Sequence, residues 1–285
     1  MSMVHTTSWR VRTLVLLTFA ALFLFGATAF AEEGEGPLKE APPTGITPEQ
    51  IIQKFAAKEK VFKQARDNYT YRQSVKVQTL DGDTVDGEYQ LVTDILFDDK
   101  GRRIENVVFA PQPTLTRIGM TREDTDDIQN RLPFVLTSDE LPEYNILYVG
   151  QQREDELDTY VFDIAPKQIE KNKRYFQGRI WVDNHDFQIV KTYGKNVPDI
   201  RKGSGENLFP KFTTYREQID GEYWFPTYTY TDDTLHFKNQ DVHIRQIVKY
   251  TNYKRFGSKS KIIYEGQELP PGQKQPTDQP APPAK

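Results

Sequence analysis

Polar and apolar residues alternate along most of the chain, and this pattern predicts β-strands. Tyr69, Tyr71, Val75 and Val77 follow a two-residue period, with polar residues such as Arg72 between them. One face of such a strand is buried and the other meets water. Further runs are separated by turn signals at Asp81-Gly82, Asp98 to Gly101, Asn184 to Asp186 and Asp220-Gly221. Short turns between successive runs predict about ten strands, most of them joined as hairpins, in an antiparallel sheet.

Helical periodicity appears first after Thr47. Thr47, Pro48 and Gln50 stand where a capping box places its N-cap, its first helical residue and its reciprocal partner. They predict a helix from Pro48 to Asn68. Its apolar residues fall near one face and are Ile51, Phe55, Phe62, Ala65 and Tyr69. A helix with such a stripe packs on another apolar surface.

A second helix is predicted from Thr121 to Arg131, because Thr121 and Asp124 open it and Pro133 follows its end. A less regular segment from Pro133 to Tyr144 follows, and the second cover segment is expected to run from Thr121 to Leu141. We expect the first helix and this second segment to cover the apolar face of the sheet. The order of elements predicts an α+β, mainly β fold with one large, strongly curved antiparallel sheet and helices on one side.

Both ends of the chain are expected to lie outside the folded domain. Residues 1–31 contain two arginines, an apolar run from Thr13 to Phe25 and then Ala29-Phe30-Ala31. This is the pattern of a secretory signal peptide cleaved after about Ala31. Residues 32–46 are predicted to be a disordered linker, and residues 266–285 a disordered Pro-rich tail. The folded domain is expected to span residues 47–265.

Composition and charge narrow the class of protein. The chain has no cysteine, so it has neither disulfides nor a lipidated cysteine at its cleavage site. The formal net charge is -4, and loss of the two signal-peptide arginines makes it about -6. Nothing in this charge balance suggests a nucleic-acid-binding surface, which would be basic. Aromatic residues make up 12% of the chain and hydrophobic residues 37%, a combination typical of half-exposed β-sheet. We expect a soluble β-rich protein of the cell envelope that binds no nucleic acid.

The run Asp183-Asn184-His185-Asp186 is the first candidate for chemistry. A histidine with two carboxylates suits a metal site or a general base. Asn and Asp are also typical of hairpin turns, because they tolerate left-handed backbone and bond their own amides. His236 and His243 are the other histidines of the mature chain and show no repeated ligand spacing. We interpret the run as a polar turn and expect no metal site and no cofactor.

Other chemical motifs are weak. The acidic run from Arg122 to Asp127 lacks the ligand spacing of a calcium loop, and acids in the first turn of a helix complement its dipole. No serine stands in a nucleophile elbow. The segment Arg201 to Gly205 does not join a strand to a helix as a phosphate loop does, and we interpret it as a mobile basic loop. Paired carboxylates stay an open alternative, but we predict no catalytic residues and no enzymatic activity.

Three segments together resemble a known family. They are Thr159 to Pro166 (TYVFDIAP), Arg174 to Lys191 with the core GRIWVD, and Thr214 to Pro226 (TYREQIDGEYWFP). In order and spacing they are similar to the outer-membrane lipoprotein-sorting family, the LolA/LolB-like proteins of bacterial envelopes. The resemblance covers most of the folded region. It implies a half-open antiparallel β-barrel whose concave apolar face is covered by helices, with acyl chains bound between sheet and helices.

The resemblance also implies a soluble periplasmic member, because the chain has no cysteine to carry a lipid anchor. The Pro-rich tail and the segment from Lys195 to Lys211 depart from the small carriers of the family, which leaves the cargo open. We expect a monomer.

The first functional hypothesis is a periplasmic carrier of lipid acyl chains or of a lipoprotein. Burial of an acyl chain gains about 0.8 kcal/mol per methylene, so an apolar slot is sufficient to hold one. Gly178 is expected to leave room on the strand that lines the slot. The candidate lipid-binding residues share the apolar faces of the two covers and of that strand, and they are Phe55, Phe62, Leu132, Phe134, Leu136, Phe176, Ile180 and Val182.

The alternative hypothesis is an envelope interaction or sensor module with a dry core and no lipid. Its partner would be a protein, such as an envelope membrane protein, or a glycan. Four aromatic residues around one strand are the candidate contact surface, since exposed aromatic patches mark binding sites. They are Tyr223, Trp224, Tyr228 and Tyr230. The space between the helices and the sheet distinguishes the two hypotheses.

Overall fold

The structure is a computed structural model that describes residues 35–98, 100, 102–202 and 205–256. The predicted signal peptide (residues 1–31), the last residues of the predicted domain (257–265) and the predicted Pro-rich tail (266–285) lie outside the described residues.

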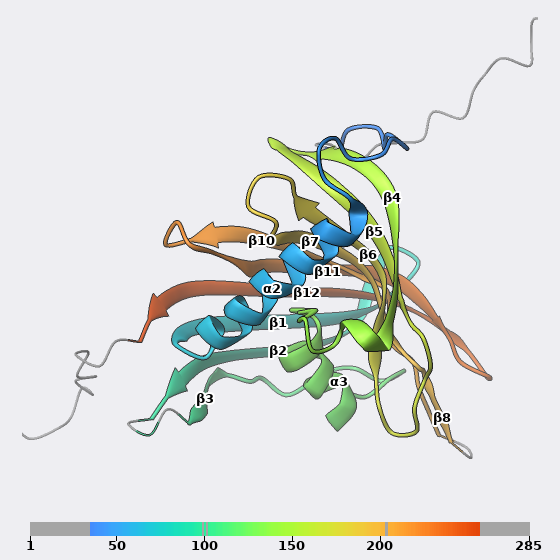
Figure 1. The fold of residues 1–285 in the computed structure, drawn as a ribbon. Coiled ribbons are helices and arrows are strands. Elements are labelled where there is room, and N and C mark those ends of the chain that lie inside the picture. The colour runs from blue at the N-terminus through green and yellow to red at the C-terminus, as the bar shows by residue number, and fades with distance from the viewer. Residues whose placement is uncertain (1–34, 99, 101, 203–204, 257–285) are drawn as a thin grey trace, which may run out of the picture. The chain divides into compact units, whose positions relative to one another are not determined.

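The ten strands of one sheet and a short two-stranded hairpin account for most of the described chain (Figure 1). The strands of the main sheet are β1 (Tyr69–Asp81), β2 (Thr84–Phe97), β3 (Arg103–Phe109), β4 (Tyr144–Glu154), β5 (Leu157–Pro166), β6 (Tyr175–Asp183), β7 (Ile189–Val197), β10 (Phe212–Ile219), β11 (Tyr223–His236) and β12 (Asp241–Arg255). Their order is β3-β2-β1-β12-β11-β10-β7-β6-β5-β4. The predicted fold class, mainly β with one open antiparallel sheet of about ten strands and few helices, is confirmed.

The first predicted helix is α2 (Pro48–Arg66). Its predicted capping box is present, since the Thr47 amide donates to Gln50 Oε1 at 3.0 Å and the Gln50 amide donates to Thr47 Oγ1 at 3.3 Å. The helix ends two residues before the predicted Asn68, where the Asn68 amide bonds Ala65 O and the chain turns into β1.

The second predicted helix is also present, in two pieces. It begins as α3 (Arg122–Asp126), and Thr121 and Asp124 form the predicted capping box. It continues as the π-helical turn η1 (Asp127–Arg131). A 3-10 turn, η2 (Leu141–Glu143), precedes β4. None of the helices in the described residues has the length and apolar character needed to cross a bilayer.

The chain divides into two compact units. The described part of the first consists of residues 35–59 and 136–198, and includes β4 to β7 and the N-terminal part of α2. The second consists of residues 60–135 and 199–256, and includes β1 to β3, β10 to β12 and the end of α2. Each unit is built by antiparallel pairing between neighbouring strands.

Helix α2 contributes core residues to both units. In the first unit, Phe55 packs on Phe162 of β5 with ring centroids 5.8 Å apart. In the second, Phe62 lies edge-on to Phe225 of β11 at 5.2 Å. Tyr69, at the start of β1, lies 4.6 Å from Phe225. All five of these phenylalanine and tyrosine side chains are fully buried, so the predicted apolar stripe is the inner face of the helix.

The segment predicted to be a disordered linker differs from that prediction where the structure describes it. We call residues 35–41 the N-terminal strap. The strap lies antiparallel to β4, with isolated bridges between Glu35 and Glu154 and between Lys39 and Gln151. Its acidic and Pro-containing composition suggested disorder, but long-range backbone hydrogen bonds to β4 hold it in place.

The basic segment that we interpreted as a mobile loop contains a short hairpin. Its strands are β8 (Ile200–Lys202) and β9 (Gly205–Asn207), which pair antiparallel. The Arg201 guanidinium is paired with the Glu206 carboxylate, so one of the basic charges is neutralised within the hairpin.

Gly178 has a different role from the one predicted. It stands opposite Gly194 in the β6–β7 pair, and a Cβ at Gly178 would lie 2.2 Å from Tyr193 O. A Cβ at Gly194 would lie 2.8 Å from Cζ of Phe176. The missing side chains therefore permit close backbone approach and make space for the Phe176 ring, which is itself buried.

Gly178→Ala is expected to destabilise the protein by about 1–3 kcal/mol, because the new methyl group meets backbone atoms that cannot move without disturbing the ladder. Chemical denaturation with circular dichroism measures the loss. Gly119→Ala is the matched control, since a Cβ there meets no atom within 4 Å. Equal stabilities of the two variants would contradict this account of Gly178.

Candidate functional site

The predicted acyl-slot residues of the first unit are buried by protein. Phe55, Leu136, Ile180 and Val182 have no exposed surface, and Phe176 is 2% exposed. Phe162, which receives the Phe55 ring, stands directly opposite Ile180 in the β5–β6 pair. A side chain that lines an empty slot as wide as an acyl chain exposes part of its surface to that slot. These side chains therefore form a filled apolar core in this structure.

The predicted slot residues of the second unit are Phe62, Leu132 and Phe134, and they are buried too. The Arg216 guanidinium lies 5.0 Å from the centre of the Phe62 ring, a distance typical of a cation–π contact. The same guanidinium donates a hydrogen bond to Phe134 O. Arg216 therefore brings Phe62 and Phe134 to one polar group of β10, an arrangement that sequence periodicity did not indicate.

The inner face of the second unit is rich in polar side chains. Its buried polar residues on the strands are Gln73, Thr79, Thr93, Thr214, Arg216, Thr229, Thr231 and Gln246. Two of them form hydrogen bonds with the second cover segment, residues 121–141. Gln73 Nε2 donates to Ile128 O at 3.3 Å, and Thr214 Oγ1 donates to Leu132 O at 3.0 Å. An acyl chain that entered here would leave these buried groups without partners, at a cost of about 1–3 kcal/mol for each.

Buried tyrosines add to this polar interior. Burial raises the pKa of Tyr69 to about 12, and the negative charge of the nearby Asp220 carboxylate adds to the effect. Burial also raises the pKa of Tyr250 and of Tyr253. These phenols stay neutral at physiological pH and pack as part of the core, with the Tyr71 and Tyr253 ring centroids 5.2 Å apart.

The turn at Asp183 has the predicted structural role. The Asp183 carboxylate accepts hydrogen bonds from the amides of His185 (3.1 Å) and Asp186 (2.8 Å), which fixes the turn between β6 and β7. Burial raises the pKa of the Asp183 carboxyl. Within the described residues, no group of three or more His, Cys, Asp or Glu side chains is arranged to hold a metal ion.

The four aromatic residues of the interaction hypothesis do not form one surface. Tyr223 packs against the buried cluster of Phe62, Tyr69 and Phe225. Trp224, Tyr228 and Tyr230 alternate with buried residues of β11 and belong to its other face. Tyr228 and Tyr230 stack with ring centroids 6.5 Å apart, and Tyr215 of β10 lies 6.4 Å from Tyr228.

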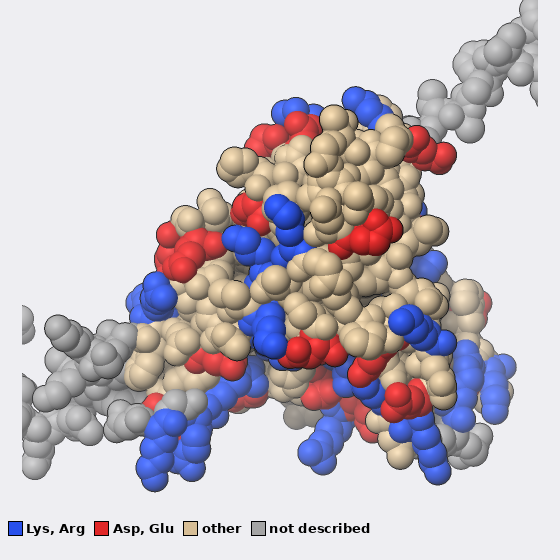
Figure 2. All heavy atoms as spheres, viewed as in Figure 1, with Lys and Arg blue, Asp and Glu red and all other residues tan. Residues whose placement is uncertain are grey.

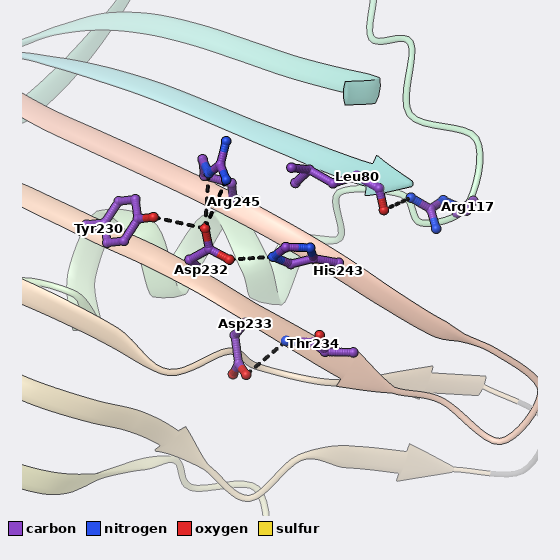
Figure 3. A network of polar contacts seen from close by, with 8 residues as sticks. All are labelled: Leu80, Arg117, Tyr230, Asp232, Asp233, Thr234, His243 and Arg245. Atoms are coloured by element: carbon purple, nitrogen blue, oxygen red, sulfur yellow. Dashed lines mark hydrogen bonds and ion pairs between the residues drawn. The ribbon is translucent and has the colours of Figure 1, made fainter. Parts of the chain in front are cut away.

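Next to this aromatic row is a network centred on Asp232 (Figure 3). Its carboxylate accepts hydrogen bonds from Tyr230 OH (2.9 Å), from the Arg245 guanidinium (3.1 Å) and from the His243 ring. Burial opposes ionisation of Asp232, but these donors outweigh it and lower the pKa of the carboxyl. These donors fulfil the hydrogen-bonding capacity of the Asp232 carboxylate on the surface of the sheet. We interpret the network as a structural contact between the neighbouring strands β11 and β12.

A second polar cluster lies in the first unit, where the strap meets the sheet. Lys191 of β7 is 4% exposed, and its ammonium is paired with the carboxylates of Glu35 in the strap and of Glu154 in β4, the latter at 3.0 Å. The ammonium also lies 4.7 Å from the centre of the Trp181 ring. Burial raises the pKa of the Glu154 carboxyl, although Lys191 opposes the shift. The lone lysine in the run Ile189-Val190-Lys191 was the one local signal for this cluster.

The edge strand β3 carries four of the exposed large hydrophobic side chains found in the described part of the second unit. All seven of its residues are exposed. Ile104, Val107, Val108 and Phe109 are 42%, 57%, 47% and 49% exposed. Exposed hydrophobic strand edges are usually shortened, charged or covered, because they pair readily with other chains.

On the face of the molecule drawn in Figure 2, basic and acidic side chains are interspersed, and no large field of one sign appears there.

No family model matches the chain, and no curated protein matches it. Among solved structures, a DUF1329 family protein from Desulfovibrio piger is 13% identical, with a TM-score of 0.38 over 71% of this chain and 92% of that one. The structure of MucB in complex with MucA(peri) is 9% identical, with a TM-score of 0.20 over 68% and 93%. A MucA/MucB complex from Pseudomonas aeruginosa is 8% identical, with a TM-score of 0.20 over 70% and 99%.

These likenesses indicate at most a distant relationship of fold, and they do not identify what this chain binds. Membership of the lipoprotein-sorting family stays a prediction from the sequence.

Alkaline titration tests the filled interior of the second unit. An exposed tyrosine loses its proton near pH 10, whereas the pKa of Tyr69 is raised to about 12. The folded state therefore holds a proton that the unfolded state releases, and stability falls as the pH rises from about 10 toward 12. We expect the last tyrosines to ionise together with unfolding, measured by tyrosinate absorbance and circular dichroism. Tyr69→Phe should reduce this pH dependence, and an unchanged dependence would contradict the burial of Tyr69.

Proposed function

We propose that this chain is a non-enzymatic periplasmic binding protein that engages a protein partner through strand β3, with its interior filled by its own side chains. The observation that carries the proposal is the exposed apolar edge of β3, where Ile104, Val107, Val108 and Phe109 are 42–57% exposed. The unpaired side of an edge strand offers backbone donors and acceptors to an extended segment, and the side chains on both sides of the strand add selectivity.

The contacts of β3 support this role. The strand pairs with β2 on one side, from the Phe97–Arg103 pair to the Val92–Phe109 pair. Its charges lie toward its beginning, where Arg103 and Glu105 pair with each other. Its last three residues are apolar, so the end of the strand presents the uncharged surface that favours association with another protein chain.

The filled interior also supports the proposal, because a protein whose interior is filled by its own side chains binds its partner on its outer surface. Phe55 and Ile180 in the first unit and Phe62 in the second have no exposed surface. In the second unit, Gln73, Thr214 and Arg216 bind the cover segment by hydrogen bonds that an acyl chain would break. Ligand binding between cover and sheet would therefore require these contacts to open, whereas β3 is the terminal strand of the sheet and pairs with no described strand on its outer side.

A charged residue on β3 tests the proposal. We expect Val107→Lys to abolish stoichiometric recovery of the partner from envelope extracts, because a lysine in an edge strand opposes pairing. The matched control is Val85→Lys, which places the same charge at an exposed valine of β2 outside the segment that pairs with β3. A partner that Val107→Lys retains as well as the control would overturn the assignment to β3.

Acyl-chain or lipoprotein carriage is the second candidate function, and one observation favours it. The inner faces of β5 and β6 in the first unit are apolar, with Phe162, Ile164, Ile180 and Val182 all buried. An acyl chain that replaced Phe55 would lie against Phe162, the ring that Phe55 contacts. Such a carrier would bind lipid in the first unit, not at β3.

Lipid analysis separates the two candidates. Under the protein-partner proposal, mass spectrometry of the protein purified from its own envelope finds no stoichiometric lipid, and a fluorescent fatty acid does not bind. Under carriage, the probe binds, and Phe55→Ala changes its affinity while Phe62→Ala, an equal truncation in the second unit, does not. Both truncations are expected to cost about 3–5 kcal/mol of stability, so folding is checked first by thermal unfolding.

A further inference from the structure

The N-terminal strap is bound to β4 as an extended peptide is bound at a sheet edge. The Gly36 amide donates to Arg153 O at 2.8 Å, and Lys39 and Gln151 exchange two backbone hydrogen bonds of 2.8 and 3.0 Å. Pro37, between them, has no amide hydrogen, so the ladder is interrupted there. Bonds of this kind recognise the backbone of a segment and are available to any extended chain that fits.

Side chains of β4 also donate hydrogen bonds to backbone carbonyl groups of the strap. Gln152 Nε2 donates to Gly36 O at 2.9 Å, and Tyr148 OH donates to Ala41 O at 2.9 Å. Gln152 is held in position by Trp181, whose Nε1 donates to Gln152 Oε1 at 2.9 Å. These donors belong to β4 and β6, so the site is built by the sheet of the first unit and not by the strap itself.

Lys191 gives the site its charge preference. Its buried ammonium binds the Glu35 carboxylate, and it keeps a second partner in Glu154 at 3.0 Å. The other carboxylate oxygen of Glu154, Oε1, is buried and has no hydrogen-bond partner within the described residues. Departure of Glu35 would leave Lys191 paired with Glu154, so the empty site holds no uncompensated buried charge. The site can therefore exchange one carboxylate for another.

Two glycines set the shape of the site. A Cβ at Gly36 would lie 3.0 Å from Cβ of Arg153, which is tighter than ordinary contact and selects glycine at that place in the bound segment. A Cβ at Gly150 of β4 would lie 2.4 Å from Lys39 O. Gly150 is therefore the position on the sheet that lets a second backbone approach.

We propose that this edge of β4, together with Lys191, is a binding site for an extended segment of a partner protein, and that the strap occupies it in cis as an internal competitor. The segment carries a carboxylate side chain followed by glycine, with the carboxylate on Lys191 and the glycine against Arg153. The strap shows which chemistry the site accepts, and the ammonium supplies the complementary charge. The site is separate from β3, so it stands or falls independently of the proposed function.

A peptide added in trans tests the site. The probe is a fluorescent peptide with the sequence of residues 32–43, EEGEGPLKEAPP. The receptor is the full mature chain with Glu35→Lys and Gly36→Val, which together release its own strap. We expect the probe to bind this variant at least about tenfold more tightly than it binds the wild-type chain, because the wild-type strap competes at high effective concentration. Fluorescence anisotropy measures both affinities.

Variants of the receptor and the probe identify the contacts. Lys191→Met in the released-strap chain should weaken binding by about tenfold or more, as should Glu35→Gln in the peptide. Lys249→Met, which removes an exposed lysine of β12, is the matched control and should change nothing. Equal binding by the peptide with glutamine would overturn the carboxylate preference, and no binding to the released-strap chain would overturn the site.

Two further measurements cover folding and the choice of occupant. Nuclear magnetic resonance of the isotope-labelled wild-type chain should show that excess unlabelled peptide shifts and exposes the amides of Gly36 and Lys39. This readout does not depend on the folding of any variant, and unchanged amides at saturating peptide would overturn the competition. Sedimentation of the wild-type chain should show a monomer. A dimer with exchanged straps would overturn the partner assignment and give the site to a second copy.

Discussion

The packing of helix α2 on the strands is the interaction on which the rest of the structure depends. Phe55 meets Phe162 in the first unit and Phe62 meets Phe225 in the second, so a single helix closes a core in each. Truncation of a buried phenylalanine costs about 3–5 kcal/mol, a large share of the stability of a domain. The chain has no cysteine, so no disulfide can replace these contacts.

The same packing decides what the interior can hold. In the first unit the strand faces under the helix are apolar, and they are filled by Phe55 and its neighbours. In the second unit, Thr214 and Gln73 hold the cover segment through its carbonyl groups. Hydrogen bonds to a fixed backbone are lost completely when a flexible apolar ligand replaces it. The interior of the second unit therefore disfavours an acyl chain for a chemical reason as well as a steric one.

The two edge strands of the sheet differ in whether another segment of the chain covers them. β4 is covered by the N-terminal strap, whose Glu35 reaches the buried Lys191. β3 pairs with no described strand along its outer side, and its exposed side chains become apolar toward its end. Proteins usually protect both edges of an open sheet, because an unpaired edge invites another chain. An edge that is covered by a removable segment and an edge that is left apolar are both suited to binding extended protein segments.

Local sequence determined the elements and their starts. The capping boxes at Thr47 and Thr121, the alternation along the strands and the turn at Asp183 depend on residues within a few positions of each other, so they could be read from the chain directly. Tertiary structure decided the rest, since the contacts involved join distant residues. Gly36 and Gln152 are 116 positions apart, and Glu35 and Lys191 are 156 apart. Whether Ile180 faces a ligand or another side chain depends on packing volume, and the role of Gly178 depends on the strand opposite. No local pattern encodes the surroundings of Ile180 or the role of Gly178, because both are set by which strands become neighbours when the sheet forms.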